Sequence, residues 1–302
     1  MKCVLCPRHC NADREKTYGV CASGLTPRVA RVSLHHWEEP CISGENGSGT
    51  VFFTGCSLHC VYCQNQKISK IPAEGGPDLL PGKEADTAEL IRIFYHLREK
   101  KAHNINLVTG DHFIPAIAGA IKKARTEGFD LPFVFNCSGY ETRESLRMLD
   151  GLIDIYLADF KYAEKELAKA YSNAEDYPEV ARLAVSEMVR QQPGCEYDEK
   201  GMLKKGVIVR NLLLPKHVYN SRKVLKYLHE TYGDRIIISI LSQYTPGDSI
   251  PDCFPELKRK VSRAEYDRLT DYAIKIGIEN AFIQEITSSD SGFIPDFDCY
   301  TG

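Results

Sequence analysis

The sequence predicts an α/β fold, an incomplete (β/α) TIM-like barrel with a small cysteine-rich N-terminal appendage. Three observations indicate this fold. From residue 50 onward, apolar runs typical of strands alternate with amphipathic segments typical of helices. The strand runs are dense in Ile, Val and Leu, as in parallel sheets covered by helices. The runs number seven, one short of a closed barrel, and the alternative is an open doubly wound sheet.

The expected strands share aliphatic and β-branched residues and follow one another at intervals that leave room for a helix. They lie at residues 50–54, 104–108, 132–136, 153–159, 207–214, 235–241 and 281–285. Two of the intervening helices begin with a capping-box pattern, in which Asp86 and Ser262 are each followed by a glutamate three residues later, Glu89 and Glu265.

The first 49 residues are expected to form a separate unit. They carry five cysteines and a glycine-rich stretch at residues 43–49, and they show no clear periodicity. So short a segment can hardly build a hydrophobic core of its own. The sequence therefore predicts a metal-binding appendage at residues 1–49 and a barrel domain at residues 50–302.

Composition limits the classes of function. The 302 residues have a formal net charge of −3 and no basic stripe interleaved with aromatic residues, so nucleic acid is not an expected partner. The longest apolar runs are far too short to span a bilayer, and the first residues contain no apolar segment of a signal peptide. We therefore expect a cytoplasmic protein without a membrane partner.

Cysteine is the most informative residue type. A reducing compartment keeps thiols from pairing, so the 12 cysteines are hard to explain as disulfides. Eight of them lie within the first 63 residues: Cys3, Cys6, Cys10, Cys21, Cys41, Cys56, Cys60 and Cys63. Clustered thiols in such a compartment indicate metal.

Three of these cysteines directly follow the first expected strand. Cys56, Cys60 and Cys63 have the spacing C-x-x-x-C-x-x-C, which suits a 4Fe-4S cluster in which three irons take cysteine and one stays open. An open iron is a place for a substrate or cofactor to bind. The alternatives are a zinc knuckle, with His59 as a fourth ligand, and a set of buried thiols.

The three-cysteine segment resembles the motif of radical S-adenosylmethionine (SAM) enzymes, with Tyr62 as the aromatic residue that precedes the last cysteine. The resemblance implies that the open iron binds SAM through its amino and carboxylate groups. One electron from the cluster then cleaves SAM to methionine and a 5′-deoxyadenosyl radical, which abstracts hydrogen from a substrate. The cofactor supplies the difficult chemistry, and the protein positions it and excludes water.

Polar residues follow the second expected strand, at the end where barrels of this type have their active site. They are Thr109, Gly110 and Asp111. Members of the family often have Gly-Gly-Glu here, which receives the amino group of SAM. This chain departs from that motif, so the resemblance implies a contact through the backbone of Thr109 and Gly110, assisted by Asp111.

The next strand ends supply further polar side chains. Asn136 and Ser138 are two residues apart and would face the same side, where they could meet the ribose of SAM. Asp159 and Lys161 have the same spacing and resemble the Asp-x-Lys motif of activating enzymes for glycyl-radical enzymes, where it helps to hold the cofactor. An ordinary ion pair is the alternative there, as it is for Arg210, the cofactor-binding candidate on the fifth strand.

The chain from Cys3 to residues 295–298 resembles an uncharacterised group named for its homology to pyruvate formate-lyase-activating enzyme. Segments that carry the resemblance are residues 6–8, 39–44, 63–65, 106–109, 138–141 and 242–244. It implies an electron donor such as flavodoxin or ferredoxin. It leaves open whether the enzyme activates a glycyl-radical enzyme or modifies a small metabolite, sugar or peptide. An iron–sulfur or zinc protein for electron transfer or binding is the alternative of another class.

A second set of cysteines precedes the barrel. Cys3, Cys6, Cys10 and Cys21 form a four-thiol set with one long gap, which would close a site for either an auxiliary iron–sulfur cluster or a zinc ion. The neighbouring cations Arg8, Arg14 and Lys16 could offset the charge of four thiolates. Of the remaining cysteines, Cys137 lies where it would line the active site, and the other three, Cys195, Cys253 and Cys299, are expected to be inert.

Overall fold

One large sheet organises the chain. The computed structural model describes residues 2–72, 75–247, 249–284 and 297, and its strands follow the order β10-β9-β8-β6-β5-β4-β2-β1-β3. Seven strands pair in parallel: β2 (Ser48–Phe53), β4 (Ile105–Val108), β5 (Phe133–Cys137), β6 (Ile155–Asp159), β8 (Leu203–Leu212), β9 (Ile237–Leu241) and β10 (Ala281–Ile283). These are the seven runs that the sequence predicts. Glu285 and Cys299, and residues 295, 296 and 298, lie outside the described residues.

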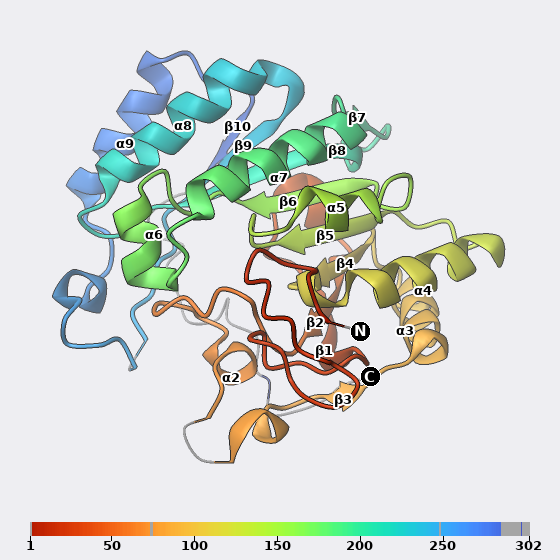
Figure 1. The fold of residues 1–302 in the computed structure, drawn as a ribbon. Helices are drawn as coiled ribbons and strands as arrows, with labels where there is room; N and C mark the ends of the chain where they lie inside the picture. The colour runs from red at the N-terminus through yellow and green to blue at the C-terminus, as the bar shows by residue number, and fades with distance from the viewer. Residues whose placement is uncertain (1, 73–74, 248, 285–296, 298–302) are drawn as a thin grey trace.

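Helices connect the parallel strands and cover the outer side of the sheet, as Figure 1 shows. The longer ones are α3 (Thr87–Glu99), α4 (Ile114–Thr126), α6 (Lys165–Ser172), α7 (Tyr177–Gln191), α8 (Val218–Tyr232) and α9 (Arg263–Lys275). The shorter helical segments are α1 (Pro40–Ser43), α2 (Gln66–Ser69), α5 (Arg143–Arg147) and the 3₁₀ turns η1 (Gly76–Leu79), η2 (Asp111–Phe113), η3 (Gly233–Arg235) and η4 (Pro255–Lys258).

The order of the parallel strands decides between the two predicted architectures. Each new parallel strand adds to the same edge of the sheet, from β2 through β10. Because such crossovers share one hand, successive additions in one direction place all connecting helices on one face, which is the arrangement of a barrel. A doubly wound sheet reverses direction at a switch point, and this sheet does not. The barrel remains incomplete, since β10 and β3 end the sheet without pairing to each other.

The helix starts agree with the sequence patterns. The Asp86 side chain accepts a hydrogen bond from the backbone amide of Glu89 at 2.8 Å and caps α3. At α9, Ser262 and Glu265 form a complete capping box, in which each side chain accepts from the backbone amide of the other residue. These contacts satisfy amide groups that would otherwise have no partner in the first turn of each helix.

Part of the N-terminal segment belongs to the sheet, although its sequence shows no strand pattern. β1 (Arg28–His35) pairs antiparallel with β2, and the short strand β3 (Lys83–Glu84) pairs with β1. A further short strand, β7 (Glu196–Tyr197), pairs with β8. His35 pairs with Ser48 at the start of β2, so residues 36–47, including α1, lie below the N-terminal end of the barrel.

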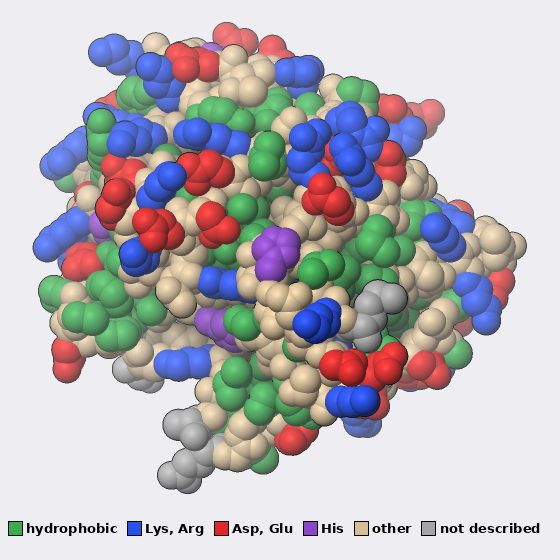
Figure 2. Space-filling view, viewed as in Figure 1, with side chains coloured by type: hydrophobic (Ala, Val, Ile, Leu, Met, Phe, Trp, Pro, Cys, Tyr) green, Lys and Arg blue, Asp and Glu red, His purple; other side chains and the backbone are tan. Residues whose placement is uncertain are grey.

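The surface agrees with the charge balance of the sequence. Figure 2 shows Lys and Arg side chains interspersed with Asp and Glu over the face in view. No helix among the described residues is both long enough and apolar enough to cross a membrane.

Candidate active site

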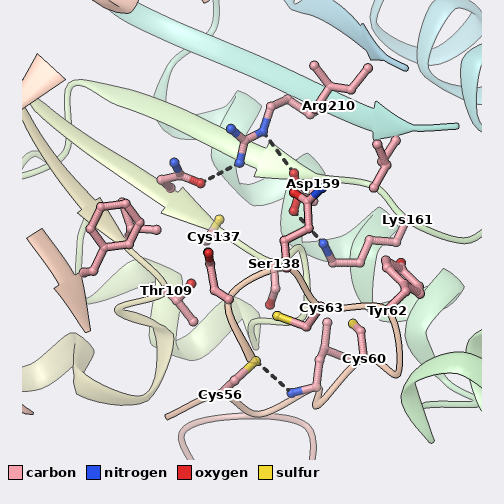
Figure 3. Close-up of a pocket in the computed structure, with 18 of the residues that line it drawn as sticks. Cys56, Cys60, Tyr62, Cys63, Thr109, Cys137, Ser138, Asp159, Lys161 and Arg210 are labelled. Carbon is pink, nitrogen blue, oxygen red and sulfur yellow. Dashed lines mark hydrogen bonds and ion pairs between the residues drawn. The ribbon is translucent and has the colours of Figure 1, made fainter. Parts of the chain in front are cut away.

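The three-cysteine loop begins immediately after β2 and lines one side of a cavity at the C-terminal end of the strands. Gly55 makes this turn with a φ of 93°, and a Cβ added there would stand 2.4 Å from the carbonyl oxygen of Cys21. Only glycine therefore fits at this position. Figure 3 shows Cys56, Cys60 and Cys63 on this side of the cavity and Lys161 facing them.

The three sulfurs are a suitable donor set for a metal cluster. Each accepts a hydrogen bond: Cys56 from the Leu58 amide at 3.4 Å, Cys60 from the Ser172 hydroxyl at 3.0 Å, and Cys63 from the Ser69 hydroxyl at 3.3 Å. Burial raises the pKa of the Cys56 thiol to about 12, and the neighbouring thiols add to the effect. Thiolates held this close together in a buried loop need cations to replace their protons, and iron supplies them.

Tyr62 anchors the loop in the barrel. Its hydroxyl accepts a hydrogen bond from Tyr162 at 2.8 Å, and its ring makes edge contacts with Tyr162, Tyr171 and Tyr244. The aromatic residue before the last cysteine therefore holds the loop against the barrel as well as lining the cavity.

The opposite wall is a network of charged groups from three strands. Asp159 at the end of β6 bonds Lys161 Nζ at 2.6 Å and Arg210 Nε at 3.0 Å, and Arg210 Nη2 donates to Asn136 Oδ1 at 2.6 Å. Burial by itself would raise the pKa of Asp159, but the two cations outweigh it and hold the pKa below its usual value. The same carboxylate raises the pKa of Lys161 despite burial. Four of the cofactor-binding candidates predicted from the sequence therefore lie in this wall: Asn136, Asp159, Lys161 and Arg210.

Glu38 completes this network and was not foreseen. It enters the barrel from the N-terminal end, where its Oε1 accepts from Asn106 Nδ2 at 3.0 Å and Asn136 Nδ2 at 3.1 Å. Its Oε2 accepts from Arg210 Nη1 at 3.1 Å. The available signal was the position of Glu38 directly before residues 39–44, which carry the family resemblance but suggested no role for a side chain.

The residues that follow β4 lie in two places. Thr109 lines the cavity, with a φ of 58°, and its amide donates to the Asn136 carbonyl at 2.8 Å. Gly110 is closely packed, since a Cβ there would lie 2.6 Å from the terminal Cδ1 atom of Ile117, which would have to move. Asp111 is buried behind the cavity wall, where it accepts from the Ser138 hydroxyl at 3.2 Å. The turn η2 directs it there.

Asp111 faces a second buried carboxyl group. The Ser138 hydroxyl lies 3.1 Å from Glu141 as well, and Asp111, Glu141 and Cys137 bring their polar atoms within 4.8 Å of one another. Burial raises the pKa of Asp111 well above its usual value, and the charge of Glu141 adds to this shift. Burial raises the pKa of Glu141 too. The two carboxyl groups therefore retain a proton between them at a pH where exposed carboxyl groups are ionised.

This pair predicts a pH effect on stability. Above about pH 4, the unfolded chain releases a proton that folded Asp111 keeps, so stability falls as pH rises toward the folded pKa. Asp111→Asn cannot ionise, and we expect its free energy of unfolding to fall less between about pH 5 and pH 8 than that of the wild type. Urea unfolding measures it, with Asp130→Asn at an exposed surface carboxyl as control. Parallel pH curves for Asp111→Asn and the wild type would contradict the prediction.

The N-terminal cysteines lie against the same loop. The Cys56 amide donates to the Cys21 carbonyl at 3.1 Å. Cys10 and Cys21 flank Gly19, whose added Cβ would lie 3.5 Å and 3.3 Å from their sulfurs. Cys6 is close enough to Cys3, Cys10 and Cys21 to interact electrostatically with each of them. The fold thus brings together the four thiols that the sequence groups.

His59 is not positioned as a metal ligand. Its two ring nitrogens lie 2.9 Å from the Ser69 carbonyl oxygen and 2.7 Å from the Val20 carbonyl oxygen. The ring instead joins the cysteine loop to the N-terminal segment. The zinc-knuckle alternative, which needs this histidine as a fourth ligand, therefore loses its support.

The cations near the N-terminal cysteines differ in their roles. Arg8 donates to the Ser57 and Ser172 carbonyls, each at 2.8 Å, and so fastens the cysteine loop to the end of α6. Lys16 is exposed and lies 4.0 Å from Asp13. Arg14 is the buried cation of the three.

The fold and the site define a class: an enzyme with a partial (β/α) barrel whose first parallel strand leads into a three-cysteine loop. Residues 50–191 match the family model of the radical SAM superfamily, and this range contains the loop and the following strands through β6. These residues form a radical SAM superfamily domain, which supports an enzyme of this superfamily, and the superfamily implies SAM and a 4Fe-4S cluster. The match favours an enzyme over the alternative of a non-catalytic metal protein.

Comparisons with individual proteins add likenesses. The chain is 25% identical over 280 residues to the uncharacterized protein MJ0674 of Methanocaldococcus jannaschii. This alignment covers 92% of this chain and 75% of that protein. SuiB of Streptococcus suis, solved with its precursor peptide SuiA, shares a TM-score of 0.47 and 11% identity over 76% of this chain. The FeFe-hydrogenase maturase HydG of Carboxydothermus hydrogenoformans shares a TM-score of 0.46 and 14% identity over the same fraction. The chain spans 46% of SuiB and 56% of HydG.

Proposed function

We propose that this enzyme cleaves SAM reductively and uses the resulting radical to take a hydrogen atom from its substrate. The single observation that carries the proposal is the cavity itself. Cys56, Cys60 and Cys63 line one side, and the charged wall of Asp159, Lys161 and Arg210 stands across from them. The thiols would hold the 4Fe-4S cluster, which supplies the electron for cleavage when SAM is bound.

The protein groups would orient SAM beside the cluster. Its amino acid portion carries both a cation and an anion, and the wall offers both signs: the carboxylates of Asp159 and Glu38 and the cations of Lys161 and Arg210. Because these groups already bond to one another, little reorganisation is needed when SAM binds. Thr109, which lines the cavity, is a candidate partner for the amino group.

Lys161→Ala tests whether this wall holds SAM. We expect the iron content to stay near that of the wild type, because Lys161 is not an iron ligand. SAM binding should weaken by about 1.5–3 kcal/mol, the loss typical of a charged hydrogen bond. Equilibrium binding under anaerobic conditions measures this change.

The matched control is Lys165→Ala, which removes an exposed lysine that pairs with Glu179 on the surface. It should bind SAM like the wild type. If Lys161→Ala also binds SAM as tightly as the wild type, the Asp159–Lys161 pair is structural and has no role in holding the cofactor.

Two substrate classes fit the proposed reaction. One is a glycyl-radical enzyme that this protein activates, with flavodoxin or ferredoxin as electron donor. The other is a small metabolite, a sugar or a peptide that is modified directly. Incubation with a glycyl-radical enzyme from the same organism, followed by EPR, separates them: a glycyl radical signal supports activation, and its absence with continued SAM cleavage supports direct modification.

We further propose that Cys3, Cys6, Cys10 and Cys21 hold a second metal centre, either an iron–sulfur cluster or zinc. Replacing Cys3, Cys6 and Cys10 together with alanine should remove that metal and loosen the N-terminal segment first, because metal binding stabilises small segments that lack a core. Metal analysis and hydrogen exchange measure the two effects. An unchanged metal content would show that these cysteines are only thiols.

A further inference from the structure

The N-terminal cysteine set and the three-cysteine loop are in direct contact. The amide of Cys56 donates to the carbonyl of Cys21 at 3.1 Å, so one residue of each set meets the other through a backbone hydrogen bond. Close packing maintains the contact, since Gly55 leaves no room for a side chain between the loop and Cys21. His59 and Val20 make a second bridge at 2.7 Å.

The four N-terminal thiols are grouped closely enough to share one centre. Cys6 is close enough to Cys3, Cys10 and Cys21 to interact electrostatically with each of them, and the sulfurs of Cys10 and Cys21 lie on either side of Gly19. Four thiolates can hold either a zinc ion or a cubane cluster. Zinc does not change its oxidation state, so a set that passes electrons to its neighbour must hold a cluster.

A buried cation accompanies the N-terminal set. Arg14 is 7% exposed and acts electrostatically on the sulfur of Cys21. Its Nη1 donates to the His112 carbonyl at 2.5 Å, and its Nη2 donates to the Gly24 carbonyl. Its buried Nε has no hydrogen-bond partner in the part of the chain that the structure describes. A buried guanidinium beside Cys21 whose Nε has no partner among the described residues suits an anionic neighbour such as a cluster with four thiolates.

Part of the N-terminal set lies at the surface of the protein. Cys3 and Cys10 are partly exposed. Several large apolar side chains of the same segment are exposed as well: Val4 (57%), Tyr18 (41%), Val20 (44%) and Leu25 (58%). Exposed apolar side chains beside a partly exposed metal set are typical of a surface where a partner docks.

From these observations we infer that Cys3, Cys6, Cys10 and Cys21 hold a 4Fe-4S cluster that passes electrons to the cluster at Cys56, Cys60 and Cys63. The inference rests on the proposed function for the second of these clusters. A one-electron donor protein of the flavodoxin or ferredoxin type reduces the N-terminal cluster. That cluster is then oxidised by one electron as the cluster in the cavity is reduced by one. A direct link between the two sets runs through the Cys21 carbonyl and the Cys56 amide.

The first test uses the wild-type protein, reconstituted anaerobically with iron and sulfide. We expect iron and sulfide sufficient for two clusters per chain, and little zinc. With both clusters reduced, the EPR spectrum should show magnetic interaction between them, because their ligands are in contact. Stoichiometric zinc at the N-terminal set, or two spectra that simply add, would overturn the inference.

The second test compares the wild type with the triple variant Cys3→Ala, Cys6→Ala and Cys10→Ala. Stopped-flow absorbance follows reduction of the cavity cluster by flavodoxin hydroquinone and, separately, by dithionite. The ratio of the two rates should fall by at least an order of magnitude in the variant, because only the protein donor depends on the relay. An unchanged ratio would overturn the relay, even if the N-terminal cluster exists.

The proposed function can fail independently of the relay. The proposed function is wrong if the triple variant contains no cluster in the cavity and the single variant Cys60→Ala still cleaves SAM. If SAM cleavage depends on Cys60 but the rate ratio does not change in the triple variant, the relay alone is wrong. SAM binding by the triple variant confirms that its barrel is folded.

Discussion

Cys60→Ala is expected to reduce SAM cleavage to the background level. Cys60 lines the cavity together with the other two cysteines of the loop, and Ser172 donates a hydrogen bond to its sulfur at 3.0 Å. Removing it leaves two ligands for a cluster that needs three, and the cluster is then lost or cannot be reduced to the state that cleaves SAM. Chromatographic detection of 5′-deoxyadenosine, with dithionite as reductant, measures the loss.

The control in the same assay is a cysteine whose removal should not affect SAM cleavage. Cys253→Ala removes an exposed free thiol outside the cavity, and we expect wild-type cleavage and iron content. Cys56→Ala and Cys63→Ala should behave like Cys60→Ala. Undiminished turnover in Cys60→Ala would refute the assignment of the loop as the cluster site.

Arg210→Ala is expected to destabilise the protein by about 3–5 kcal/mol, the cost of breaking a buried ion pair on one side. Arg210 is largely buried and bonds Glu38 at 3.1 Å and Asp159 at 3.0 Å. Without it, Glu38 keeps only the neutral amides of Asn106 and Asn136 as partners, and a carboxylate remains buried without a cation. Urea unfolding measures the loss.

Two further variants separate charge from volume. In the double variant Glu38→Gln with Arg210→Met, the uncompensated carboxylate is removed as well, so we expect part of the lost stability to return. Lys204→Ala, on the same strand, removes an exposed partner of Asp198 and should cost less than about 1 kcal/mol. Equal losses in Arg210→Ala and the double variant would show that packing, and not charge, makes Arg210 important.

The parallel strands could be predicted because each is buried almost completely. β4 and β5 contain only buried residues, so the sequence of each shows an apolar run that a single asparagine interrupts, Asn106 in β4 and Asn136 in β5. β1 was missed because its buried positions, Val29, Ala30 and Val32, alternate irregularly with Arg31 and Ser33. The irregularity has a structural cause, since the pairing register of β1 with β2 shifts between Val29 and Arg31.

The residues of the site likewise include some that the sequence predicts and some whose position only the structure shows. Cys56, Cys60 and Cys63 lie within eight residues of one another, so their spacing alone indicates a shared cluster. Asp111 was expected to assist SAM binding from the end of β4. The turn η2 instead buries it against Ser138 and Glu141, and nothing in a strand-end pattern reports the direction of the following turn.

The sequence by itself indicated the three cysteines of the loop and the positions of the parallel strands along the chain, because ligand spacing and strand runs are local patterns. Only the tertiary structure decided which distant groups share the cavity. Glu38 meets Asn106, Asn136 and Arg210 at separations of 68, 98 and 172 residues, and Cys21 meets Cys56 across the boundary that the sequence suggested. Such contacts depend on how residues 36–47 pack at the N-terminal end of the barrel and how the N-terminal segment packs on the cysteine loop. The sequence of side-chain types does not indicate which distant residues come into contact.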